Sequence, residues 1–284
     1  MSDILTVAMD AIVVTLVLAL AAFGLAIIYG LVGVINMAHG AMLTLGAYIA
    51  WTATSHGLPF VVAVLAAGIV VGLIGLLLEH GIIRHFYDRP FDTLLLTWAF
   101  FLIITELIKI VFGTDFRNVP SPFPGAIALG TIKIPAYRTF IAGLSLVLMI
   151  STAILLYRTS LGIKIRALIQ NREVASLLGL NINRTYKTVF GLGSFIAGIS
   201  GALIAPMLSV DPYIGNVYLV RSFFVVIVGG IGQILAGTLV GSFLIGGAET
   251  LFSIFTNQVV AQAAVFFLAI VILRFRPEGV IRSR

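Results

Sequence analysis

The sequence predicts an all-α protein that crosses a membrane many times and forms one transmembrane domain over residues 1–284. Hydrophobic residues make up 60% of the 284 positions, charged residues only 10%, and the mean hydropathy is +1.16. A water-soluble domain of this size would need roughly 25% charged residues to cover its surface. The apolar residues also come in long uninterrupted runs. We therefore expect lipid to surround most of the chain.

Nine apolar runs have about the length that a membrane-crossing helix requires, which is about 20 residues for ~30 Å of hydrocarbon. They fall at 11–31, 38–54, 60–83, 93–112, 138–157, 187–208, 217–234, 236–255 and 258–274. Each is expected to be helical, because backbone polar groups find no water in lipid. Two Gly-rich stretches, 29–46 and 228–241, contain polar residues and are expected to break or re-enter. The expected count is eight to ten spans, with nine as the best number.

The distribution of basic residues predicts the orientation, because Lys and Arg resist translocation. If nine helices alternate, 12 of the 17 Lys and Arg fall on one side, six of them in the loop 158–187. The other side carries Arg117, Lys133, Arg138 and Arg221. We therefore expect a periplasmic N-terminus and a cytoplasmic C-terminus. The loop 113–137 contains four prolines and is expected to form an irregular external cover.

Small residues spaced four apart predict close helix packing, since they fall on one helix face where backbones can approach. Three such pairs are Gly68 with Gly72, Gly193 with Ala197, and Gly237 with Gly241. We interpret them as packing positions and not as substrate contacts.

The basic loop 158–187 contains the pattern of a short helix over 170–181. Asn171 is suited to capping its start, Glu173 to the first turn, and Gly179 to ending it. Val174, Leu177 and Leu178 share one apolar face. An amphipathic helix in a cytoplasmic loop suggests docking of a soluble partner. The alternative is that this face folds back on the helix bundle.

The sequence excludes several classes of function. It shows no HExxH motif, no acid pair at helical spacing and no GxxxxGK[ST] phosphate loop, so we expect no catalytic or metal site and no ATP binding by this chain. Cys is absent, which rules out disulfides and thiolate metal sites. The net charge of +6 arises from loops and the tail, so we expect no nucleic-acid partner.

Polar residues inside apolar runs are the candidates for a solute pathway. Asn36, His39 and Gly40 lie in the first Gly-rich stretch, and Gln233 lies in the second. Broken helices at membrane depth are tolerated where they line a cavity. Each stretch is equally compatible with a cytoplasmic turn between two short helices.

Ionisable residues inside spans are costly and are treated as functional candidates. Glu106 and Lys109 are three apart and are expected to neutralise each other. Glu249 has no cation three or four residues away. It is expected to face another helix, a partner subunit or the pathway.

Several segments in order along the chain resemble permeases of the hydrophobic amino acid uptake family of ATP-binding cassette (ABC) importers. These segments are YGLVGVINMAHGAMLTLGAY (29–48), NREVASLLGLNINR (171–184), FGLGSFIAGISGAL (190–203), SFFVVIVGGIGQILAGT (222–238) and LRFRPEGV (273–280). The resemblance implies a bacterial inner-membrane permease that forms half of a translocation pathway. The implied partners are a homologous second permease, two ATPase subunits that bind ATP and Mg²⁺, and a periplasmic solute-binding protein.

The resemblance also implies that the short helix is the loop that couples this chain to an ATPase. The residues carried over are Asn171, Arg172, Glu173, Val174, Ala175, Leu177, Leu178 and Gly179. Within the family, FYDRPFDTLLLTWAF (86–100), IQNR (169–172) and GGIGQ (229–233) are similar to urea permeases, whereas ASLLG (175–179) is similar to the amino acid branch. We expect urea or a short amide as the solute, with branched-chain amino acids as the alternative.

Two other classes of function compete with an ABC importer. A gradient-driven secondary transporter or a channel would usually place coupling-ion sites near the membrane centre, and acids inside the spans are few here. An intramembrane enzyme would need paired catalytic residues, which the sequence lacks.

Overall fold

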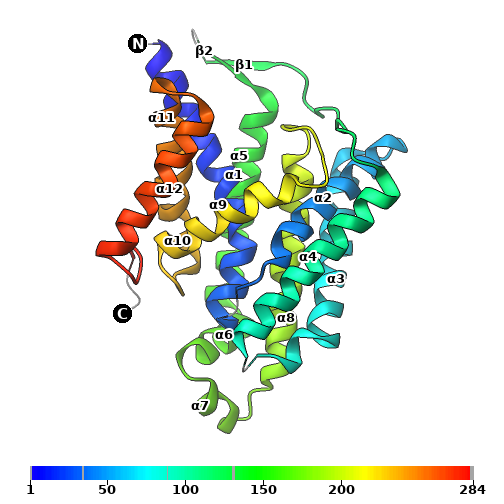
Figure 1. The fold of residues 1–284 in the computed structure, drawn as a ribbon, viewed down its shortest axis with the longest axis vertical. Coiled ribbons are helices and arrows are strands. Elements are labelled where there is room, and N and C mark those ends of the chain that lie inside the picture. The colour runs from blue at the N-terminus through cyan, green and yellow to red at the C-terminus, as the bar shows by residue number, and fades with distance from the viewer. Residues whose placement is uncertain (1, 34, 88, 130–131, 282–284) are drawn as a thin grey trace.

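The computed structural model describes residues 2–33, 35–87, 89–129 and 132–281, and it is dominated by helices (Figure 1). The longer helices are α1 (Ser2–Val32), α2 (Ala38–Ser55), α3 (Phe60–Gly81), α4 (Pro90–Phe112), α5 (Ala136–Arg158), α8 (Ile182–Ile204), α9 (Ile214–Gly229) and α12 (Gln258–Phe275). The shorter elements are the 3₁₀-helix η1 (Ile83–His85), α6 (Ser160–Gln170), α7 (Arg172–Leu177), α10 (Ile234–Ser242), the π-helix η2 (Phe243–Gly247), α11 (Ala248–Phe255) and the strands β1 (Ala126–Leu129) and β2 (Ile132–Pro135).

Each of the nine apolar runs lies mostly in helix, but among the described residues only seven helices are long and apolar enough to cross a membrane. These are Val7–Gly30, Phe60–His85, Pro90–Phe112, Ala136–Arg158, Ile182–Ile204, Ile234–Phe255 and Gln258–Phe275. The expected count of about nine is therefore not confirmed. The two runs outside the count are α2, which is too polar, and α9, which is too short.

The position of α2 explains why it can be polar. It packs against α8, α3, α9 and α4, and most of its residues are buried. Protein surrounds this helix, so its side chains need not be soluble in lipid. Its Thr, His and Gly residues make its mean hydropathy low, but their polar groups are not exposed to hydrocarbon.

α8 is the centre of the bundle, and α1, α2 and α3 pack around it. Glycines allow these backbones to approach closely: a β-carbon at Gly193 would lie 2.7 Å from the carbonyl oxygen of Gly24. At Gly68 a β-carbon would lie 2.8 Å from Ile199 Cγ1, and Gly241 packs directly on the backbone of Val225. The predicted packing role of the small residues is confirmed at these positions.

Both Gly-rich stretches break as expected. α1 ends at Val32 and α2 begins at Ala38, with Gly33 at a φ of +69° between them. α9 ends at Gly229 and α10 begins at Ile234, with Gly230 at +116° and Gly232 at +88° in the intervening turn. Positive φ values are readily adopted by glycine, which has no β-carbon to clash.

The N-terminus and the β1–β2 hairpin lie at one end of the molecule, and α7 lies at the opposite end (Figure 1). The expectation of an irregular external loop over 113–137 was wrong in part, because β1 and β2 pair antiparallel, with Ile127 opposite Ile134. β-Branched Ile residues favour such pairing. A separate bridge between Arg117 and Val210 ties the same loop to the connection between α8 and α9.

Candidate functional site

Asn36 and His39 lie at the start of α2 and are both fully buried. Asn36 Oδ1 accepts a hydrogen bond from the backbone N–H of Ala38 at 3.1 Å, and His39 Nε2 donates to the carbonyl of Ala21 in α1 at 2.8 Å. The second polar atom of each side chain, Asn36 Nδ2 and His39 Nδ1, has no partner among the described residues. A buried donor and a buried acceptor are therefore both available three residues apart.

Neighbouring helices fix the position of this break. The backbone N–H of Met37 donates to Thr97 Oγ1 in α4 at 3.1 Å. Gly40 faces α9, where a β-carbon would lie 3.0 Å from the carbonyl oxygen of Gly215. The N–H of Gly215 in turn donates to Thr44 Oγ1 at 3.1 Å. The start of α2 is therefore held by α1, α4 and α9 together.

The second break lies beside the end of α1. A β-carbon on Gly30 would lie 3.4 Å from Ile234 Cγ1 and 3.7 Å from Gly232 Cα. Gln233 precedes α10 and is half-buried, and its carbonyl accepts the N–H of Gly237 at 2.8 Å. The end of α1, just before the first break, thus lies against the second break through Gly30.

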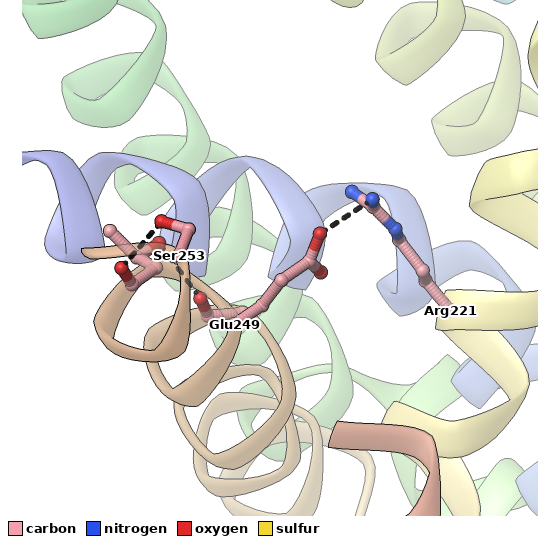
Figure 2. Close-up of polar contacts among 5 residues, drawn as sticks. Arg221, Glu249 and Ser253 are labelled. Carbon is pink, nitrogen blue, oxygen red and sulfur yellow. Dashed lines mark hydrogen bonds and ion pairs between the residues drawn. The ribbon is translucent and has the colours of Figure 1, made fainter. Parts of the chain in front are cut away.

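Glu249 lies elsewhere, at the start of α11, and forms an ion pair with Arg221 of α9. The two side chains point toward each other across the helices, and Arg221 Nη2 donates to Glu249 Oε1 at 2.7 Å (Figure 2). Of the three alternatives given for Glu249, this pair fits a side chain that faces another helix. Arg221, which was counted among the basic residues of the external side, lies halfway along α9. Its position inside the apolar run 217–234 was the signal that could have identified the pair.

The predicted local pair of Glu106 and Lys109 is confirmed, with Lys109 Nζ donating to Glu106 Oε1 at 2.7 Å. Lys109 also lies over the ring of Tyr213, with Nζ 4.7 Å from the ring centroid. Because Tyr213 immediately precedes α9, this contact joins the end of α4 to the start of α9.

The predicted helix in the basic loop is present as α7, but it is shorter than the expected range 170–181, because it spans only Arg172–Leu177 and α6 extends to Gln170. Asn171 caps it by accepting from the N–H of Val174 at 3.0 Å, Glu173 lies in its first turn, and Gly179 follows it with a φ of +83°. Leu177 and Leu178 are 86% and 77% exposed, so the apolar face does not fold back on the described bundle. The other side of α7 is anchored, because Ala175 is buried.

A tyrosine pair that sequence reasoning missed connects α7 to the bundle. Tyr87 donates to Glu79 Oε1 in α3 at 2.6 Å, and its ring centroid lies 4.8 Å from that of Tyr186 in α8. The Arg172 guanidinium of α7 lies over Tyr186, 5.7 Å from the ring centroid. Burial, followed by the hydrogen bond to Glu79, raises the pKa of Tyr87. Glu79 itself is buried.

No group of three or more His, Cys, Asp or Glu side chains that could hold a metal ion occurs among the described residues. The polar groups of this chain are arranged for hydrogen bonding inside a membrane and for contact at one end of the bundle. Neither arrangement provides a nucleophile with an adjacent base.

Comparison with known families gives one match over most of the chain: residues 7–274 match the family described as branched-chain amino acid transport system, permease component. The high-affinity branched-chain amino acid transport system permease protein LivH of Escherichia coli is 27% identical over 280 residues, covering 93% of this chain and 90% of LivH.

Two further relatives carry related names. The permease protein BraD of Pseudomonas aeruginosa, also of a high-affinity branched-chain amino acid transport system, is 26% identical and covers 93% of this chain and 91% of its own. A probable branched-chain amino acid transport permease protein of Methanocaldococcus jannaschii is 29% identical and covers 85% of this chain and 78% of its own. No solved structure matches the chain.

Proposed function

The chain belongs to the family of permease components of branched-chain amino acid transport systems, and we propose that it forms half of the pathway of an ATP-driven importer for branched-chain or other hydrophobic amino acids. The relatives named above support this solute class. Our sequence-based preference for urea or a short amide finds no support among them. None of them is named as a gradient-driven carrier or a channel.

The observation that carries the proposal is the exposed apolar face of α7. Leu177, Leu178 and Val174 present hydrocarbon to water at one end of the bundle, on a helix capped at both ends. Exposed apolar patches of this kind mark contact sites for other proteins. We place an ATPase subunit on this face, and ATP with Mg²⁺ belongs to that subunit. A rigid helix transmits nucleotide-driven motion, whereas a flexible loop would absorb it.

The other proposed partners follow from the proposal that this chain forms half of the pathway. A second, homologous permease completes the pathway, two ATPases occupy the α7 end, and a periplasmic solute-binding protein delivers solute at the hairpin end. We place the chain in the bacterial inner membrane, with the N-terminus periplasmic and the C-terminus cytoplasmic. This orientation puts the basic loop 158–187 on the side that retains Lys and Arg.

The buried polar groups at the start of α2 are our candidates for the solute pathway. Asn36 Nδ2 can donate to a carboxylate and His39 Nδ1 can accept from an ammonium group, which are the two ends of an amino acid. Gly40, next to His39 in α2, and Gln233, in the second break, are the other two candidates. Glu249, also a candidate for the pathway, has its charge satisfied by Arg221 and serves best as a helix-to-helix contact.

Uptake into proteoliposomes that contain this chain and its genomic partners tests the proposal. We expect ATP-dependent uptake of leucine, isoleucine and valine, and none of urea or acetamide. Leu177→Asp is expected to abolish uptake or release the ATPase while membrane insertion persists. Ser176→Asp is the matched control, because it adds the same charge to an exposed α7 residue off the apolar face. Normal uptake and ATPase co-purification in Leu177→Asp would contradict the docking assignment.

A further inference from the structure

The end of the chain returns to the bundle and bonds to the turn between α9 and α10. The N–H of Val280 donates to the carbonyl of Val228 at 2.8 Å, and the N–H of Ile281 donates to the carbonyl of Gly229 at 3.2 Å. These carbonyls belong to the last turn of α9, whose final carbonyls have no partner within the helix. The C-terminal segment 276–281 therefore completes the hydrogen bonding of a helix end far from it in sequence.

Two glycines make this contact possible. Gly279 has a φ of +86°, and a β-carbon there would lie 2.5 Å from Gly230 Cα and 2.8 Å from the carbonyl oxygen of Ile227. Gly230 has a φ of +116°, and a β-carbon there would collide with the carbonyl of Ile281. Each glycine is required both by its backbone conformation and by the closeness of the facing backbone.

The same turn borders the elements that lead to α7. A cleft of about 60 Å³ lies between α6 and the turn, and it is lined by Leu156 and Tyr157 of α5, by Ile165, Arg166 and Ile169 of α6, and by Gly232 and Ile234 of the turn and α10. α6 ends at Gln170, and α7 starts two residues later. The α9–α10 turn therefore lies across a cleft from the helix that leads to α7.

We propose that Gly230 and Gly279 are positioning residues, which fix the α9–α10 turn to the C-terminal segment so that α9, α10 and the end of α12 keep one arrangement while the ATPase drives the transport cycle. This inference rests on the proposed function. The two positive-φ glycines of the turn make it deformable, because glycine adopts many backbone conformations at little cost. The two backbone hydrogen bonds from Val280 and Ile281 remove that freedom, so α9, α10 and the end of α12 move as one unit.

Substitution of the two glycines tests the proposal in the assembled, reconstituted transporter. Gly279→Ala and Gly230→Ala are each expected to lower the amount of solute taken up per ATP hydrolysed by about tenfold, within the range of coupling changes measured elsewhere, while ATPase activity and subunit composition persist. Uptake per ATP in the double variant is expected to be no lower than in either single variant, because both substitutions disrupt the same contact. Gly81→Ala is the control, since a β-carbon there meets nothing within 4 Å.

Unchanged uptake per ATP in both single variants, or additive losses in the double variant, would overturn the proposal. If either variant fails to assemble, a disulfide between Val228→Cys and Val280→Cys in this cysteine-free chain decides the question. Uptake per ATP is expected to be equal in the oxidised and reduced forms. Failure of the disulfide to form, or loss of uptake on oxidation that dithiothreitol restores, would also overturn it. Absence of ATP-dependent uptake in the parent protein would instead contradict the proposed function.

Discussion

Arg221 in α9 and Glu249 in α11 neutralise each other inside the helix bundle, with Nη2 and Oε1 2.7 Å apart and side chains only 13% and 8% exposed. Glu249 lies two residues after the π-helix η2, and such irregular turns shift the side chains that follow them along the helix surface. The pair joins the seventh apolar run to the eighth. Neither charge has to face lipid or stand alone in the interior.

We predict that removing one member of this pair destabilises the protein more than removing both. Arg221→Leu or Glu249→Leu leaves one buried charge without its partner, which costs about 3–5 kcal/mol, whereas the double variant is expected to be close to the parent. Thermal unfolding in detergent, followed by loss of monodisperse protein, measures this difference. Equal destabilisation by the single and double variants would mean that the charges act separately.

We predict that cysteines at Asn36 or His39 react with small water-soluble thiol reagents only while ATP is being hydrolysed. Both side chains are fully buried here, so the resting protein should not be labelled. His56→Cys, at an exposed position after α2, is the control that should be labelled in every state. Absence of labelling at both buried positions in all nucleotide states would favour a packing role for Asn36 and His39.

We predict that reporter fusions at the C-terminus and within the loop 113–137 report opposite sides of the membrane. The N-terminus and the β1–β2 hairpin lie at one end, and α12 runs back from that end (Figure 1). Nine crossings give this result, because five of them lie between the loop and the C-terminus. If α2 and α9 did not cross, only four crossings would lie between the two fusions, and both would report the same side. The same reading from both fusions would therefore contradict the nine-crossing topology.

We predict that Tyr87→Phe destabilises the α7 end of the bundle. It removes the donor to the buried Glu79 carboxylate, at a cost of about 1.5–3 kcal/mol for a hydrogen bond to a charged group. The raised pKa of Tyr87 means that this bond contributes stability below about pH 10, the unfolded tyrosine value, and that the stability is lost as the pH rises through the folded pKa. The stability difference between the parent and Tyr87→Phe is therefore expected to be full at pH 7 and to shrink progressively as the pH rises above about 10. Tyr157→Phe, an exposed tyrosine on α5, is the control.

Contacts between residues close together in the sequence were predictable, and contacts between residues far apart in the sequence were not. The caps of α7 and the pair of Glu106 and Lys109 depend on residues within four positions, and all were found as expected. The partner of Glu249 is 28 residues away, and Tyr186 lies 99 residues beyond Tyr87. No periodic pattern predicts such contacts. Hydropathy likewise could not tell α2, which is enclosed by protein, from a lipid-facing span.

The enclosure of α2 has a consequence for biosynthesis. A segment that contains His39, four threonine or serine side chains and few strongly apolar ones gains little by partitioning into lipid, because polar residues make insertion from the translocon unfavourable. The same segment is stable once α3, α4, α8 and α9 surround it. It follows that α2 must enter the bilayer in the company of its neighbours and remain sheltered until α8 has been synthesised. Biosynthesis of this protein therefore depends on keeping the first helices together until α8 has been made. Chains that end before residue 182 are expected to be degraded by membrane proteases.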